Sequence, residues 1–123
     1  MSFRLRWTPR ATTTFQELQR AAERAAKLRS PTHKSAEGRR RTKASKQEGL
    51  FKQVAKAVRL LADNPRHGGL NNHEYDSLEH PFDRNGKVFE AYAQNRTPGA
   101  YRIFWCYGPG KGEIAIIAIT PHP

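Results

Sequence analysis

Two apolar runs near the end of the chain constrain its fold more than any other feature. They cover residues 101–107 (YRIFWCY) and 113–120 (EIAIIAIT), and only the stretch GPGKG separates them. A connection this short joins antiparallel strands, because a parallel crossover needs about a dozen residues or more. The second run is apolar on both faces, which predicts a central strand of its sheet. A further antiparallel strand is predicted over 87–95 (KVFEAYAQN), before a turn centred on Pro98 and Gly99.

The first half of the chain adds one strand and two helices to this prediction. Residues 3–7 alternate between apolar and basic side chains, which is typical of a half-buried strand that ends near Pro9. Residues 12–28 carry apolar side chains at helical spacing, and Thr14 and Glu17 have the spacing of a capping box. A second helix is predicted over 50–63, where apolar side chains share one wide face and Asn64-Pro65 ends the pattern.

These elements follow the order β-α-α-β-β-β along a chain of 123 residues. A chain of this length is expected to form one domain with a single modest core. Two helices on one face of a mostly antiparallel sheet make a two-layer α+β fold. The sequence therefore predicts a single α+β domain over residues 1–123, in which a helical hairpin packs on the sheet.

The chain is strongly basic. It has 22 Lys and Arg residues against 11 Asp and Glu residues, which gives a formal net charge of +11. Such a charge attracts polyanions, so nucleic acid is the first partner class predicted and an acidic protein is the second. A basic surface that only keeps the chain in solution is the alternative. The side chains expected to contact RNA are Lys52, Lys56, Arg59, Arg66, Lys87, Arg39, Arg40 and Arg41.

The segment 29–48 has no apolar periodicity and is rich in Lys, Arg, Ser and Gly. This composition predicts a flexible basic loop between the two helices. Arg39, Arg40 and Arg41 would then act as an arm that grips phosphates. A solvated linker, or an extension of the flanking helices, fits the same composition.

Other features argue against several classes of protein. Cys106 is the only cysteine, so no disulfide can form within the chain. No apolar run reaches the ~18 residues that span a bilayer, and the N-terminus lacks the apolar core of a signal peptide. A cytoplasmic protein that does not enter the membrane is therefore expected. His67, His73 and His80 lie among acidic residues, but their spacing matches no common zinc site, so neither a metal nor a cofactor is expected.

Four stretches carry a family resemblance: DNPRHGGL after the second helix, KVFEAYAQ, PGAYRIFWCY and the ending IAIIAITPH. Together with the element order, they resemble the RelE/ParE superfamily of toxins from bacterial type II toxin–antitoxin systems. The resemblance covers about residues 49–123, and over residues 2–28 only the topology agrees. It implies one of two activities: RelE-type members cleave messenger RNA in the ribosomal A site, whereas ParE-type members inhibit DNA gyrase. Both are neutralised by a cognate antitoxin, so a toxin–antitoxin hetero-oligomer is implied.

Metal-free RNA cleavage needs a base for the ribose 2′-hydroxyl, a cation for the phosphate and an acid for the leaving 5′-oxygen. The resemblance implies that Arg102, in the motif AYRIFW, faces the substrate cleft. It also implies that Glu90 and His122 stand where some members carry the base and the acid. Tyr92 shares the strand face of Glu90 and could stack on a base or bind a phosphate. Lysines that other members carry on this strand are absent apart from Lys87.

Each of these assignments has a structural alternative. Arg102 could form an ion pair with Glu90 or Glu113. Glu90 could be a solvated carboxylate on an edge strand, Tyr92 a plain surface residue, and His122 a frayed terminal residue. The hypothesis from the sequence is a ribosome-dependent mRNA endonuclease that inhibits translation. The alternatives are a non-catalytic gyrase inhibitor and a non-toxic, basic RNA-binding relative.

Overall fold

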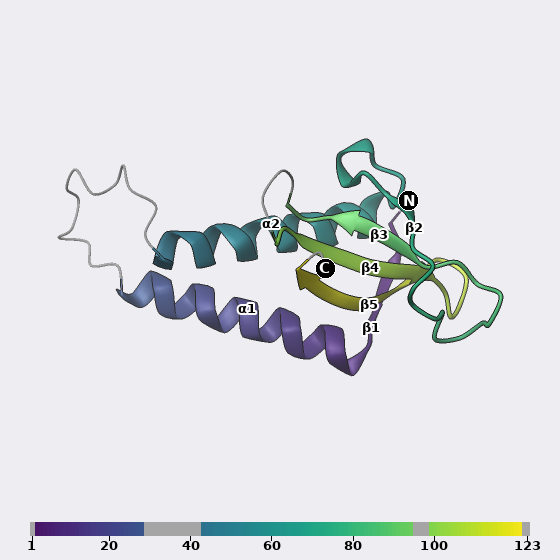
Figure 1. Cartoon of the computed structure of the whole chain (residues 1–123), viewed down its shortest axis with the longest axis horizontal. Coiled ribbons are helices and arrows are strands. Elements are labelled where there is room, and N and C mark those ends of the chain that lie inside the picture. The colour runs from purple at the N-terminus through teal and green to yellow at the C-terminus, as the bar shows by residue number, and fades with distance from the viewer. Residues whose placement is uncertain (1, 29–42, 95–98, 122–123) are drawn as a thin grey trace.

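The computed structural model describes residues 2–28, 43–94 and 99–121. Two helices, α1 (Pro9–Leu28) and α2 (Lys43–Asp63), pack side by side on one face of a five-stranded sheet (Figure 1). Neither of these two helices is long and apolar enough to cross a membrane. The strands are β1 (Arg4–Trp7), β2 (His73–Glu74), β3 (Phe89–Tyr92), β4 (Tyr101–Tyr107) and β5 (Glu113–Pro121), and the short 3₁₀ helix η2 (Gly68–Leu70) precedes β2.

The strands lie in the order β1-β5-β4-β3-β2. β1 pairs with β5 in parallel, and the other neighbouring strands are antiparallel. β5 therefore lies between β1 and β4, as its two apolar faces predict. The predicted α+β class, with a helical hairpin on a mostly antiparallel sheet, is confirmed. β2 is an addition, because its two residues lie in a segment that carries no strand signal.

α1 begins at Pro9, ahead of the predicted start at residue 12. The Thr8 hydroxyl oxygen accepts a hydrogen bond from the Ala11 N–H (3.1 Å), and the hydroxyl donates to the Ile117 carbonyl oxygen (2.7 Å). Thr8 therefore caps the helix and ties its start to β5, and proline suits the first helical position because it needs no N–H there. The capping box predicted at Thr14 is wrong, because this hydroxyl donates to a carbonyl of the preceding turn (3.1 Å).

α2 begins at Lys43, within the segment 29–48 for which the sequence predicts a basic loop. The alternative of a helix extension therefore holds for residues 43–48. The rest of that segment, 29–42, includes Arg39, Arg40 and Arg41 and lies outside the described residues.

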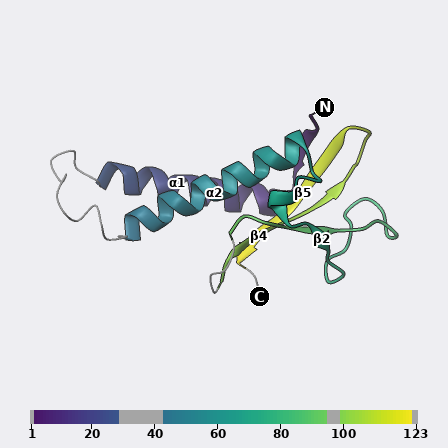
Figure 2. The same ribbon diagram turned by 90° about the horizontal axis from the view of Figure 1, so that it is seen from above.

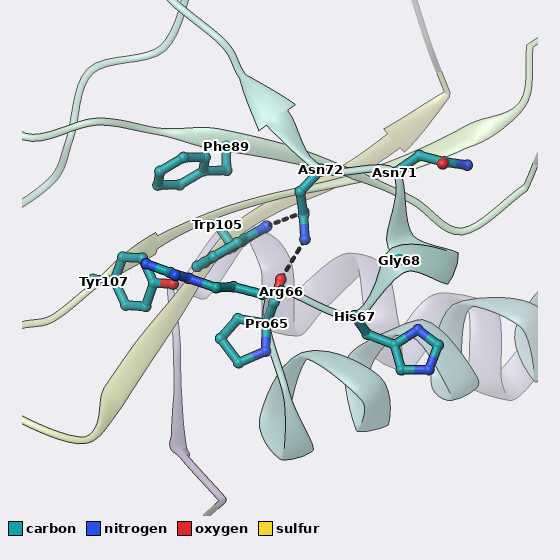
Figure 3. A pocket seen from close by; sticks show the side chains of 9 residues that line it. All are labelled: Pro65, Arg66, His67, Gly68, Asn71, Asn72, Phe89, Trp105 and Tyr107. Carbon is teal, nitrogen blue, oxygen red and sulfur yellow. Dashed lines mark hydrogen bonds between the residues drawn. The ribbon is translucent and has the colours of Figure 1, made fainter.

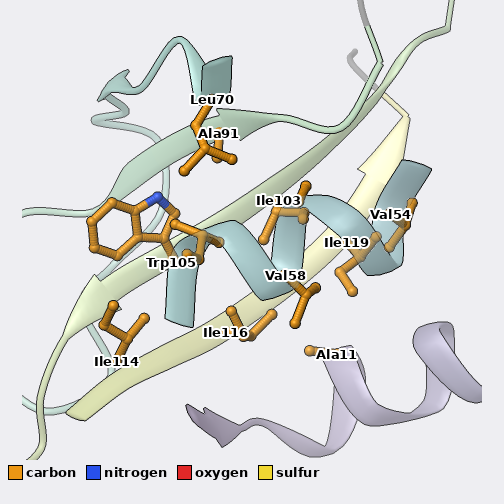
Figure 4. Close-up of a cluster of buried hydrophobic side chains, with 12 residues drawn as sticks. Ala11, Val54, Val58, Leu70, Ala91, Ile103, Trp105, Ile114, Ile116 and Ile119 are labelled. Carbon is orange, nitrogen blue, oxygen red and sulfur yellow. The ribbon is translucent and has the colours of Figure 1, made fainter. Parts of the chain in front are cut away.

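The main core lies between the helices and the sheet, as Figure 4 shows. Trp105, Ile103 and Ile116 project from β4 and β5 toward the helix layer and pack with Val58 of α2. Ala11 of α1 is fully buried in the same cluster. Its small side chain lets the first turns of α1 lie close to the sheet.

A smaller core lies on the opposite face of the sheet, which neither helix covers (Figure 2). Tyr75 and Leu78, in the segment after β2, pack against this face, and the rings of Tyr75 and Phe104 lie 4.6 Å apart. The buried members of this cluster are Val88, Phe104, Cys106, Ala115, Ile117 and Ala118. The segment after β2 therefore covers the part of the face nearer the β4–β5 turn, and Glu90, the cross-strand partner of Phe104, lies beside it.

Candidate functional site

Two cross-strand rows bring polar side chains together on the sheet face that the helices leave uncovered. In one row His73 of β2 pairs with Glu90 of β3. In the next row Tyr92 of β3 pairs with Arg102 of β4, which also pairs with Thr120 of β5. Paired residues share a face because side chains alternate along each strand. Ala91 lies between Glu90 and Tyr92 in β3 and points into the core on the helix side of the sheet. The side chains of both rows therefore point away from the helices.

Glu90 lies at the centre of this group, and its side chain is only 1% exposed. Its Oε1 atom lies 2.5 Å from His73 Nε2, and its Oε2 atom lies 4.0 Å from Arg102 Nε. The alternative of a solvated edge carboxylate is therefore wrong, because β2 continues the sheet beyond Glu90. A buried carboxylate needs such partners, since removing a charge from water costs several kcal/mol when nothing compensates it.

Arg102 is the buried cation of the group, with a side chain 9% exposed. Its Nη1 atom donates to a backbone carbonyl oxygen (2.7 Å), and its guanidinium carbon lies 3.7 Å from the Tyr92 ring centroid. The ion pair with Glu90 is present, whereas Glu113 pairs with Arg6 (3.3 Å). Within the described residues, the Nε–H of Arg102 is buried without a hydrogen-bond partner. An unsatisfied buried donor costs about 1–3 kcal/mol, so the fold holds this guanidinium at a cost in stability.

His73 completes the group, although the sequence places it only in a loop. Its side chain is 47% exposed, and its ring lies edge-on to the Tyr92 ring with centroids 5.6 Å apart. The sequence does not place it beside Glu90, because β2 is too short to leave a periodic pattern. Only its pairing with Glu90, a contact between distant parts of the sequence, places it in the site.

The histidines of this segment have separate partners. His67 and His80 each accept hydrogen bonds from nearby backbone N–H groups, and His73 contacts Glu90. Within the residues that the structure describes, no group of three or more His, Cys, Asp or Glu side chains could hold a metal ion.

A hollow of about 240 Å³ opens beside the group on the same sheet face. Thr120, the cross-strand partner of Arg102, lines it together with Phe104, the cross-strand partner of Glu90. The remaining lining residues are Arg10, Tyr75, Ser77, Leu78 and Ala118. A basic side chain and aromatic rings beside a buried arginine suit a ligand that carries both phosphate and a base.

A larger hollow, of about 410 Å³, lies on the helix side of the sheet (Figure 3). Phe89 and Trp105 line it with their rings stacked at a centroid distance of 4.9 Å, and the half-exposed ring of Tyr107 lies edge-on to both. Arg66 is exposed, and Figure 3 shows its side chain extending along the hollow toward Tyr107. Arg66 therefore lies on the opposite side of the sheet from the Glu90–Arg102 pair.

The segment between this hollow and His73 is fixed by side-chain hydrogen bonds. The Asn72 side chain accepts from the Trp105 indole N–H (2.9 Å) and donates to the Pro65 carbonyl oxygen (Figure 3). Leu70 is fully buried in the main core just before it. Asn72 therefore anchors the backbone immediately before His73.

The remaining predicted contacts are not brought into this group. The exposed side chains of Lys52, Lys56 and Arg59 lie on α2, in the layer that covers the other face of the sheet. Lys87 forms an ion pair with Glu74 of β2 (3.0 Å). Arg39, Arg40, Arg41 and His122 lie outside the described residues. The structure thus joins Glu90, Tyr92 and Arg102 and adds His73 to them.

No protein-family model matches the chain, and no curated protein matches it in sequence. Solved structures match it over nearly its full length. A YoeB/ParE toxin from Agrobacterium tumefaciens matches with a TM-score of 0.57 and 12% identity, over 98% of this chain and 99% of that chain. An archaeal RelE–RelB complex from Pyrococcus horikoshii OT3 matches with a TM-score of 0.52 and 13% identity, over 98% and 96%. A chromosomal ParDE toxin–antitoxin system from P. aeruginosa matches with a TM-score of 0.51 and 16% identity, over 99% and 98%.

The sequence identities to these structures are too low for an activity to be transferred to this chain. Each match nevertheless covers both the helices and the sheet. The chain therefore has the fold of the RelE, ParE and YoeB toxins, as its sequence predicts.

Proposed function

We propose that this chain is a RelE-type toxin that cleaves messenger RNA on the ribosome, without a metal ion, and thereby inhibits translation. The observation that carries the proposal is the buried Glu90–Arg102 pair on the uncovered sheet face, beside a hollow of about 240 Å³. Buried ionisable groups next to a cavity are typical of catalytic sites. The shared fold supports the same proposal.

In the proposed reaction, the ribose 2′-oxygen attacks the adjacent phosphorus and the 5′-oxygen leaves, which produces 2′,3′-cyclic phosphate and 5′-hydroxyl ends. Arg102 stabilises the negative charge that grows on the phosphate through its fixed positive charge. Glu90 provides the negative charge that favours removal of the 2′-hydroxyl proton, and His122 protonates the leaving oxygen. Tyr92 packs against the guanidinium and holds its plane.

The net charge of +11 supports two kinds of partner. Ribosomal RNA would be bound through the exposed cations of α2, namely Lys52, Lys56 and Arg59. An antitoxin with acidic segments would be attracted by the same charge. Two of the similar structures are a RelE–RelB complex and a ParDE system, which supports a cognate antitoxin in the proposed assembly. The proposed function would be carried out in the cytoplasm, where both proposed partners are found.

The competing function is gyrase inhibition, which the likeness to a ParDE system favours. That function needs a binding surface and no cleavage chemistry. Substitutions that remove catalytic groups but keep the fold would therefore leave its toxicity intact.

Induced expression in a bacterial host, with growth followed and RNA ends mapped, tests the proposal. The unaltered protein is expected to stop growth and to create new 5′-hydroxyl ends inside translated messages. An Arg102→Ala, His122→Ala double variant is expected to lose both effects, because acid–base groups alone contribute roughly 10²–10⁴-fold. Arg84→Ala removes an exposed arginine from the loop before β3 and is the matched control, which should stay toxic.

Circular dichroism of the purified variants separates loss of chemistry from loss of folding. Growth arrest that persists in a folded double variant, with intact messages, would contradict RNA cleavage and favour gyrase inhibition. A lack of growth arrest by the unaltered protein would favour a non-toxic RNA-binding relative.

A further inference from the structure

We infer that His73 is the side chain that takes the proton from the RNA, and that Glu90 is a positioning residue that acts through His73. The inference rests on the proposed function and assigns its base. Its starting point is a contrast in exposure: the Glu90 side chain is 1% exposed, whereas that of His73 is 47% exposed. The buried carboxylate has no surface to offer a ribose hydroxyl, and the half-exposed imidazole has.

The contacts of the imidazole ring suit this role. His73 Nε2 lies 2.5 Å from Glu90 Oε1, so Nε2–H donates to the carboxylate and the lone pair of the neutral ring is on Nδ1. Nδ1 lies 3.3 Å from the Asn71 carbonyl oxygen, which can only accept a hydrogen bond, so the neutral ring with its lone pair on Nδ1 makes no hydrogen bond there. A hydroxyl group of a ligand can therefore replace this contact. Imidazole is also the side chain that exchanges a proton most readily near neutral pH.

The ring is held in place from several directions. Asn72 anchors the preceding backbone to Trp105 and Pro65, and the β2–β3 pairing sets His73 opposite Glu90. The Tyr92 ring packs edge-on against the imidazole. A base that is fixed in this way reacts without first losing conformational freedom.

The 2′-hydroxyl proton moves to His73 Nδ1 as the 2′-oxygen bonds to phosphorus, and the bond from phosphorus to the 5′-oxygen breaks. The leaving oxygen takes a proton from His122, which is the acid in the proposed function. The carboxylate of Glu90 stabilises the imidazolium, which returns its proton to water. Among the described residues, the charged or titratable groups that contact His73 are Glu90 and Tyr92 of β3. Arg102 of β4 pairs with Glu90, and Glu74 of β2 is bound to Lys87.

Single-turnover cleavage of a message on programmed ribosomes tests the inference across a range of pH. His73→Ala is expected to lower the cleavage rate by roughly 10²–10⁴-fold and to remove the acidic limb of the pH profile. Added imidazole is expected to restore about tenfold or more of that loss, because the cavity left by the ring lies next to Glu90. Glu90→Gln is expected to lower kcat, whereas the acidic limb of the pH profile is expected to remain. His80→Ala, in the loop before β3, is the control and should cleave at the unaltered rate.

Three results would overturn the inference. One is a His73→Ala variant that cleaves at nearly the unaltered rate. Another is a His73→Ala variant whose slow cleavage is not restored by imidazole, together with a His73→Gln variant that cleaves at nearly the unaltered rate. That pattern indicates a structural role for the His73 side chain. The third is an unaltered protein that leaves messages on the ribosome intact, which would remove the proposed function as well. The first two leave the proposed function standing, so the two failures are distinguishable.

Discussion

At the scale of single residues, the Glu90–Arg102 pair links stability to chemistry. Within the described residues, these two are the charged side chains that are buried. Removing one partner leaves the other charge without compensation, which typically costs about 3–5 kcal/mol. We therefore predict that Arg102→Met lowers the free energy of unfolding by about this amount in urea titrations. Arg84→Met, at an exposed loop position, should change it by less than about 0.5 kcal/mol.

A double-mutant cycle sharpens this prediction. The Glu90→Gln, Arg102→Met variant should be less destabilised than the sum of the two single variants, because it leaves no isolated buried charge. Strict additivity would show that the two side chains do not interact across their 4.0 Å separation.

Cys106 gives a second prediction at this scale. Burial raises the pKa of the Cys106 thiol from an ordinary 9.0 to about 11. The folded protein therefore keeps its proton where the unfolded chain has lost it, so this residue's contribution is fully present below pH 9 and is lost as the pH rises toward 11. We predict that the unaltered protein loses more unfolding free energy between these pH values than Cys106→Ala does. Equal losses would contradict this, and urea titrations at each pH provide the measurement.

At the scale of elements, the segment between α2 and β3 depends on Asn72. Its side chain satisfies the Trp105 indole N–H and holds the Pro65 carbonyl. We predict that Asn72→Ala destabilises the protein by about 1–3 kcal/mol, because it leaves a buried donor unpaired. It should also slow RNA cleavage, because β2 is no longer anchored. Asn85→Ala, in an exposed turn, is the control, and equal effects of the two substitutions on thermal unfolding would contradict the role of Asn72.

The elements also show which features a sequence can predict. The helices and long strands have enough residues for apolar periodicity to reveal them, and alternation correctly sets Glu90 and Tyr92 on one face. The short strand β2 and the start of α1 depend on distant contacts instead. Thr8 begins α1 partly because its hydroxyl binds Ile117, and His73 joins the site because it pairs with Glu90. No local pattern reports such contacts.

At the scale of the whole molecule, the two layers separate two kinds of surface. The sheet face away from the helices carries the buried ion pair and the hollow beside it. The helix layer carries exposed cations, including Lys52, Lys56 and Arg59 on α2. The sequence predicts the net charge and the cations but not this separation, because it follows from how the hairpin packs on the sheet. The proposed toxin would bind RNA phosphates with one layer and cleave with the other.

This division of surfaces predicts how RNA affinity depends on salt. Changing Lys52, Lys56 and Arg59 together to Gln should lower the magnitude of the slope of log affinity against log salt by about 2–3, since each phosphate contact contributes about 0.7–0.9. The matched control changes Arg20, Arg24 and Lys27, which have the same spacing on exposed positions of α1. The two variants carry the same net charge, so a difference in their RNA affinity depends on where the cations lie and not on how many there are. Measured at several salt concentrations, the affinity for ribosomes should be lower and should depend less on salt in the α2 variant than in the α1 variant. Equal weakening would mean that only the overall field of the protein attracts RNA, and that α2 is not the contact surface.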